Sequence, residues 1–126
     1  MCTSRPRPSR TLLYSYELAN SPGNNIVAFR LEFAPNGWFP PHRHGGASVF
    51  GHVLEGSVLN GMNSDPTTVV RKGEAWYEAP GCHHRVFEND SEIEAAVMLA
   101  VYIVSSKVLV EDGLAALVVV DEGYGG

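Results

Sequence analysis

The sequence predicts a single all-β domain, built as a sandwich or a small barrel such as a jelly roll. Short runs rich in Val, Ile, Tyr and Phe alternate with Gly, Pro, Asn and Asp at intervals of roughly ten residues. Helical periodicity is scarce. The 126 residues suffice for one packed core, and no linker interrupts the rhythm. A β-barrel of this size can enclose one small ligand.

The first five expected strands are each bounded by turn residues. "TLLYSYEL" at Thr11–Leu18 is closed by "ANSPGNN", and "IVAFRLEF" at Ile26–Phe33 alternates well before "APNG". Ser48–Gly56 and Ser57–Asn60 follow one another, and "NSDP" then makes a turn before Thr67–Val70.

The later strands follow the same rhythm. "RKG" turns into Glu74–Glu78, and "APG" precedes His83–Phe87. Ala95–Ser106 is long enough for a helix, but its Val, Ile and Tyr content favours a buried strand. Leu114–Asp121 is expected to be the last strand. Long β-rich runs lie near both ends of the chain, and exposed edge strands can pair with the same strands of a second copy. We therefore expect a homodimer.

Charge and composition exclude several classes of partner. The net charge of −5 argues against nucleic acid or an anionic membrane as the main partner. Residues 1–10, with Arg5, Arg7 and Arg10 among prolines and serines, are expected to form a flexible tail. Residues 11–126 would then form the barrel.

The cysteine count and the apolar runs indicate the compartment. Cys2 and Cys82 are the only cysteines, which is too few for a disulfide framework. No apolar run typical of a secretory signal precedes Leu12, and no run approaches the roughly 18 apolar residues of a membrane helix. We therefore expect a cytoplasmic, reducing environment.

Two histidine groups stand out. If the chain is extended at His42 and His44, both imidazoles lie on one face and Arg43 lies on the other. Two neutral imidazoles on one face suit a divalent transition metal. Further along, the Pro80-Gly81 turn leads into His83-His84. Only one of these neighbours can face the interior, and that one could supply a third ligand.

The residues around the first group follow a known motif. His42-x-His44 is followed by "GGAS", Val49, six residues and Gly56. This pattern resembles the first motif of the cupin superfamily: Gly, five residues, His-x-His, three or four residues, Glu, six residues and Gly. Gly37 lies one residue away from the position of the motif's leading glycine, and the sequence "VLEG" at Val53–Gly56 is typical of the family.

The second group resembles the second cupin motif: Gly, five residues, Pro-x-Gly, two residues, His, three residues and Asn. Gly73 is followed by five residues, then by Ala79-Pro80-Gly81, two residues and His84. Ala79 takes the place of the motif proline and Glu88 that of the motif asparagine. The spacing selects His84 over His83 as the third ligand. The resemblance covers roughly residues 18–104, and it implies a single-domain cupin jelly-roll barrel.

The family's usual fourth ligand, the Glu of the first motif, is absent. Val49 stands in its place, and the alternative register offers Ser48. The resemblance therefore implies a metal held by His42, His44 and His84 alone. Such an ion would keep its full +2 charge beside an apolar wall at Val49, which belongs to the substrate pocket. We expect the substrate to chelate it as an enolate, a catecholate or a carboxylate.

The resemblance implies a reaction class. Three-His sites occur in some cupin-type non-haem iron dioxygenases, so a dioxygenase is the leading hypothesis, with iron first and zinc, nickel, copper or manganese as alternatives. A Lewis-acid isomerase, cyclase or decarboxylase working through an enolate is the runner-up. A non-catalytic sensor that binds a small molecule is the third. A further alternative is that the histidines are structural and the metal site has been lost.

Three other residues are weak catalytic candidates. Glu78 shares a face with Trp76 and Glu74, and it could be a general base if that face is interior. Carboxylates are more commonly exposed than buried. If Glu74 and Glu78 are exposed, Ala75 and Tyr77 line the barrel instead. Tyr102 could hydrogen-bond a substrate, although a buried tyrosine more often finds a backbone partner. His83 should face outward, with a surface role or a role in proton transfer.

The remaining histidine and the second cysteine are expected outside the site. His52 should lie on the opposite face from Val49, packed or at an interface. Cys82 could supply a thiolate to a soft metal, but the motif spacing favours His84.

Overall fold

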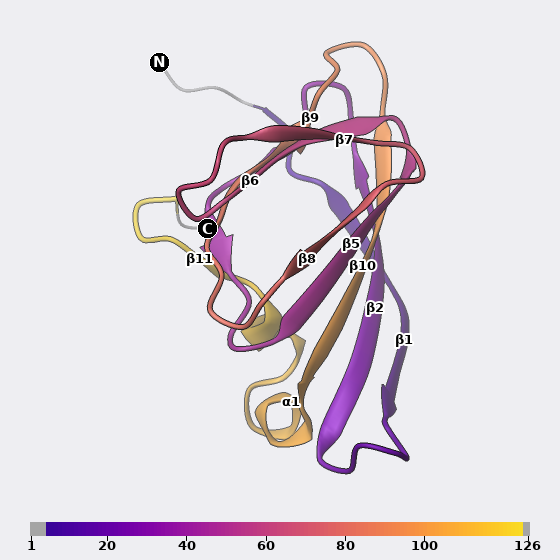
Figure 1. The fold of residues 1–126 in the computed structure, drawn as a ribbon, viewed down its shortest axis with the longest axis vertical. Helices are drawn as coiled ribbons and strands as arrows, with labels where there is room; N and C mark the ends of the chain where they lie inside the picture. Colours follow the sequence, from indigo (N-terminus) through magenta and orange to yellow (C-terminus); the bar gives the residue numbers. More distant parts are fainter. Residues whose placement is uncertain (1–4, 125–126) are drawn as a thin grey trace.

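The computed structural model describes residues 5–124, and Cys2 lies outside this range. Two sheets face each other and form a jelly-roll barrel, as the ribbon shows (Figure 1). The first sheet has five strands in the order β1 (Ser9–Glu17), β2 (Asn24–Phe33), β10 (Ala96–Ser105), β5 (Ser48–Glu55) and β8 (Ala75–Glu78). The second has the order β11 (Val119–Val120), β4 (His42–Arg43), β9 (His84–Asn89), β6 (Ser57–Met62) and β7 (Thr68–Arg71), and β3 (Trp38–Phe39) pairs with β9. The all-β jelly-roll prediction is confirmed.

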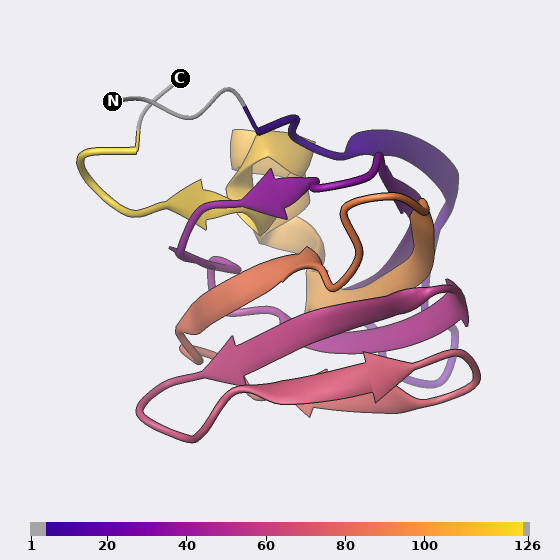
Figure 2. The same ribbon diagram turned by 90° about the horizontal axis from the view of Figure 1, so that it is seen from above.

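The core lies between the two sheets, which Figure 2 shows from above. From Phe29 in β2 and from Met98 in β10 onward, buried residues alternate with more exposed ones, which turns one row of apolar side chains of each strand into this space. The Phe33 ring of the first sheet lies 4.9 Å from the Phe87 ring of the second, in an edge-on arrangement. Ala95–Ser106, whose length also allowed a helix, is the strand β10.

The C-terminal part of the chain differs from the prediction. Leu114–Asp121 was expected to be one strand, but it contains the 3-10 helix η1 (Leu114–Leu117) and only the short strand β11. A helix that the sequence did not predict, α1 (Ser106–Asp112), precedes it, because the Ser105 side chain accepts a hydrogen bond from the Lys107 N–H and caps its first turn. Residues 5–124 include no helix with the length and hydropathy that crossing a lipid bilayer requires.

The C-terminal segment packs into the end of the barrel and needs a glycine beside it. Leu117 is fully buried. Gly45, with φ of +60°, passes so close to the Ala116 carbonyl oxygen that a Cβ atom at this position would overlap it. Gly45 therefore allows η1 to approach the loop that carries His44.

The N-terminal residues also contact the barrel. β1 begins at Ser9, inside the predicted tail, and the Trp38 N–H donates to the Pro6 carbonyl oxygen. The Arg5 Nε donates to the Asn36 carbonyl oxygen at 3.0 Å. All side chains of β1 are exposed, at one edge of the five-stranded sheet. The homodimer and the cytoplasmic location expected from the sequence stay predictions.

One close approach in the barrel is testable. Gly51 of β5 pairs with Trp76 of β8, and a Cβ atom on Gly51 would overlap the indole ring. We expect Gly51→Ala to lower the free energy of unfolding by about 1–3 kcal/mol, because the indole must move to make room. Denaturant unfolding followed by tryptophan fluorescence measures the change. His52→Ala, next along the strand and exposed, should stay within about 0.5 kcal/mol. Equal stabilities of the two variants would contradict this packing.

Candidate metal centre

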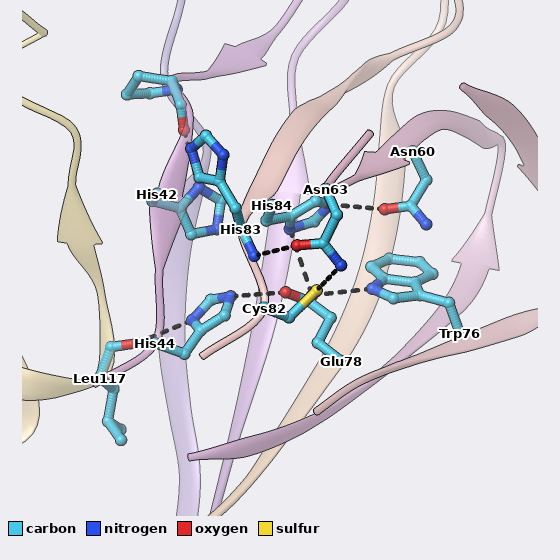
Figure 3. Close-up of polar contacts among 11 residues, drawn as sticks. His42, His44, Asn60, Asn63, Trp76, Glu78, Cys82, His83, His84 and Leu117 are labelled. Carbon is cyan, nitrogen blue, oxygen red and sulfur yellow. Dashed lines mark hydrogen bonds and ion pairs between the residues drawn. The ribbon is translucent and has the colours of Figure 1, made fainter. Parts of the chain in front are cut away.

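The structure brings together the three histidines that the motifs single out (Figure 3). His42 lies on β4 and pairs directly with His84 at the start of β9, while His44 follows two residues after His42. All three are buried, and each offers a ring nitrogen within 4.8 Å of the others. Three imidazoles from two neighbouring segments thus converge inside the barrel.

Each imidazole is oriented by an oxygen on the far side of its ring. The pairs are His42 Nδ1 with the Pro40 carbonyl (2.7 Å), His44 Nδ1 with the Leu117 carbonyl (2.8 Å) and His84 Nε2 with the Asn60 side-chain oxygen. A ring nitrogen that donates to such an oxygen leaves the other nitrogen of a neutral imidazole unprotonated. The lone pairs of His42 Nε2, His44 Nε2 and His84 Nδ1 are therefore available to a metal.

Burial keeps the rings of His42 and His84 neutral. It lowers the pKa of His42 to about 3, with the neighbouring His84 and His44 adding to the effect. Burial likewise lowers the pKa of His84 to about 4. Metal binding requires the neutral imidazole, so these two rings can accept a metal throughout the neutral pH range without releasing a proton.

A carboxylate faces the histidines, which corrects two expectations. Glu78 at the end of β8 is only 2% exposed, although exposure was the favoured prediction. Its Oε1 lies 3.1 Å from His44 Nε2 and its Oε2 lies 3.2 Å from His84 Nδ1. Glu74 is exposed, as predicted. The expectation that no side-chain acid stands beside the three imidazoles is therefore wrong, because the carboxylate comes from β8, outside the first motif.

The environment of Glu78 keeps it ionised. Burial alone would raise the pKa of this carboxyl, but the imidazoles of His44 and His84, when protonated on the facing nitrogens, and the indole N–H of Trp76 lower it to about 2. The Trp76 Nε1–H donates to Oε2 at 2.9 Å. Because β8 alternates, Trp76 and Glu78 both turn inward, while Tyr77 between them is exposed.

The contacts between Glu78 and the imidazoles fit a bound cation. His44 Nδ1 lies at hydrogen-bond distance from a carbonyl, so a neutral His44 ring that donates there presents the lone pair of Nε2 to the Glu78 Oε1. Neither of these two buried atoms has a hydrogen-bond partner. Two buried acceptors about 3 Å apart repel each other unless positive charge lies between them. A divalent metal ion would satisfy both, and the imidazole and carboxylate donors suit a transition metal.

A small apolar cavity of about 50 Å³ adjoins the cluster. Val49, Phe87 and Tyr102 line it, together with Pro8 and Val118 from the two ends of the described chain. Its volume corresponds to roughly three or four water molecules. The position predicted for Val49 in the pocket agrees with this lining.

Tyr102 lies at the cavity wall, 3% exposed, with its ring 5.4 Å from that of His44. Burial raises the pKa of its phenol, so the hydroxyl stays protonated at neutral pH. The backbone partner expected for it is not among the hydrogen bonds of residues 5–124. Its hydroxyl can donate to a ligand in the cavity.

The other singled-out residues lie outside the cluster. His83 is partly buried, and its Nε2 contacts the Asp121 carboxylate at 2.8 Å. Cys82 accepts a hydrogen bond from the Asn63 amide, and partial burial raises the pKa of its thiol. His52 is exposed on the outer face of β5.

The sequence patterns did not predict two contacts that support the site residues, one from Asn60 to His84 and one from Trp76 to Glu78. Asn60, which orients His84, carries no motif; a polar residue in an apolar strand was the only signal for it. The hydrogen bond from Trp76 to Glu78 follows from their spacing of two along a strand.

Comparisons with known proteins agree with this geometry. The cupin domain model matches residues 29–102. Oxalate oxidase GF-2.8 of Triticum aestivum is 31% identical over 103 residues, which cover 74% of this chain and 46% of the oxidase. A germin-like protein of Oryza sativa, 2-2, is 35% identical over 89 residues, covering 64% of this chain and 40% of that protein. The chain thus spans about half the length of the curated relatives it matches.

Solved structures show the same barrel. A recombinant oxalate oxidase in complex with glycolate superposes with a TM-score of 0.60 and 28% identity, covering 75% of this chain and 50% of the other. DMSP lyase DddQ of Ruegeria pomeroyi superposes with a TM-score of 0.68 and 15% identity, covering 95% of this chain and 54% of the lyase. At this identity the similarity supports the fold alone. With its matched domain, its barrel and its two histidine motifs, the chain belongs to the cupin family.

Proposed function

We propose that the protein is a metal-dependent enzyme that acts on a small oxygenated acid or enolate bound at His42, His44 and His84. One observation carries this proposal: ring nitrogens of three buried histidines lie within 4.8 Å of one another, and the buried Glu78 carboxylate lies 3.1 Å and 3.2 Å from two of these rings. The leading reaction class is oxidation by dioxygen. Relatives named oxalate oxidase, one of them in complex with glycolate, support this class and indicate two-carbon acids as first substrates to test.

The residues of the chain have separate tasks in this proposal. The imidazoles hold the ion, which supplies Lewis acidity and, where its oxidation state can change, electron transfer. Val49 and Phe87 exclude water from the cavity, and this strengthens every charge interaction inside it. Tyr102 lines the cavity, and in this proposal its hydroxyl donates to a substrate oxygen. The small volume restricts the substrate to a few heavy atoms.

A second reaction class needs the same site. A Lewis-acid isomerase, cyclase or decarboxylase would also bind an enolate at a three-His ion, and its turnover would not need dioxygen. The donor set of imidazole and carboxylate accepts manganese, iron, nickel, copper or zinc, so metal analysis of the purified protein is the first measurement. Tight binding of a small acid without turnover would indicate the non-catalytic sensor.

We expect His84→Ala to abolish stoichiometric metal binding, because it removes a lone pair from the cluster. Elemental analysis of the purified protein measures bound metal for each chain. The matched control is His52→Ala, which removes an exposed imidazole from the same barrel and should leave the metal content unchanged. Full metal content in a folded His84→Ala variant would contradict the ligand assignment.

Asn60→Ala should weaken metal binding about 10–100-fold, since the amide oxygen fixes the ring of His84 and the position of its proton. Titration of the metal-free protein, followed by calorimetry, gives the affinity. Asn20→Ala, in an exposed turn, is the control. An affinity within twofold of wild type in both variants would show that the hydrogen bond does not orient a ligand.

Oxygen consumption separates the two reaction classes. Protein loaded with manganese or iron should consume oxygen when oxalate or glycolate is added, and an oxygen electrode measures the rate. Loss of turnover in His84→Ala but not in His52→Ala would tie it to the cluster. Undiminished turnover of a substrate under anaerobic conditions would favour the Lewis-acid enzyme instead.

A further inference from the structure

Glu78 stands across a ladder from the position where the cupin motif has its glutamate. Val49 of β5 occupies that position, and Val49 and Glu78 are direct partners in the antiparallel ladder. Side chains of such partners leave the sheet on the same face, with Cβ atoms about 4.5–5.5 Å apart. A carboxylate carried by either residue therefore reaches the same region beside the histidines.

The distances around Glu78 are those of neighbouring ligands on one ion. Its two oxygens lie 3.1 Å from His44 Nε2 and 3.2 Å from His84 Nδ1. Two ligand atoms bound to one ion at about 2.1 Å lie about 3.0 Å apart in octahedral coordination and about 3.4 Å apart in tetrahedral coordination. Because each contact joins a carboxylate oxygen to an imidazole lone pair, it is unfavourable without a shared cation.

The neighbours of Glu78 form a support built for it. The Trp76 N–H holds Oε2, and the absence of a side chain on Gly51 makes room for the indole ring. Glu78 is 2% exposed, so it is not a surface carboxylate that happens to point inward. Both of its oxygens turn toward imidazole nitrogens, which is the orientation of a ligand rather than of a base aimed at a substrate.

We propose that Glu78 is the fourth protein ligand of the metal, supplied from β8 in place of the first-motif glutamate that Val49 lacks. The inference rests on the proposed function, because it needs a metal at the three histidines. In this arrangement the carboxylate is carried by β8 instead of β5, and it reaches the same region beside the three histidines.

Relocation of the carboxylate is directly testable with the 126-residue protein. Glu78→Gln keeps the shape and removes the charge; Val49→Glu/Glu78→Val returns the carboxylate to β5. Metal-free protein is titrated with Mn²⁺ by calorimetry and with Co²⁺ by visible absorption, which reports the ligand set. We expect Glu78→Gln to lower the affinity by at least the roughly 10–100-fold effect of an outer-shell partner and to change the Co²⁺ spectrum. The exchanged variant should recover most of the affinity.

The controls separate the possible failures. Glu74→Gln, on the same segment but exposed, should bind as wild type does. Wild-type affinity and spectrum in Glu78→Gln, with metal lost in His84→Ala, would overturn the fourth ligand and leave the three-His centre. Metal retained in both variants would overturn the proposed function itself. If Glu78→Gln fails to fold, the exchanged variant decides alone: no recovery of binding in folded protein refutes the relocation.

Discussion

The structure depends on one electrostatic constraint: an ionised carboxylate is buried against imidazole lone pairs. Glu78 and His44 present two unpaired acceptors to each other in a region from which water is largely excluded. Burial of unpaired polar groups costs several kcal/mol unless a partner compensates. A cation between these groups would remove the repulsion, so a bound ion and the polar interior of this barrel would stabilise each other.

The rest of the barrel holds this arrangement in place from several directions. The Pro40 and Leu117 carbonyls and the Asn60 amide fix the imidazoles, while the Trp76 N–H fixes the carboxylate. Leu117 belongs to the C-terminal segment, so that segment both closes the cavity and orients His44. Ligands held by packed strands and their hydrogen bonds keep their geometry better than ligands on free loops.

The sequence predicted the fold and the three histidines because both depend on short-range patterns. Alternation along β2 and β10 and the spacing of His42, His44 and His84 are visible in a single chain. The inward position of Glu78 was not, because it depends on the register in which β8 pairs with β5, which decides the face of β8 that turns to the core. The helix α1 was missed as well, since its seven residues carry β-branched side chains and only the Ser105 cap marks its start.

The charge of the site follows from Glu78. A divalent ion beside three neutral imidazoles and one carboxylate leaves a net charge of +1. Glu78 is the only charged side chain among the described residues that line the cavity, whose other walls include Val49, Phe87 and Ala100. In such apolar surroundings a single positive charge is neutralised by one anionic group of a substrate, whereas a dianion would leave an excess negative charge without a partner. With Glu78 as the proposed fourth ligand, the site therefore favours monoanionic chelating acids and enolates, so that of the two acids proposed as first substrates glycolate is favoured over oxalate, which is a dianion at neutral pH.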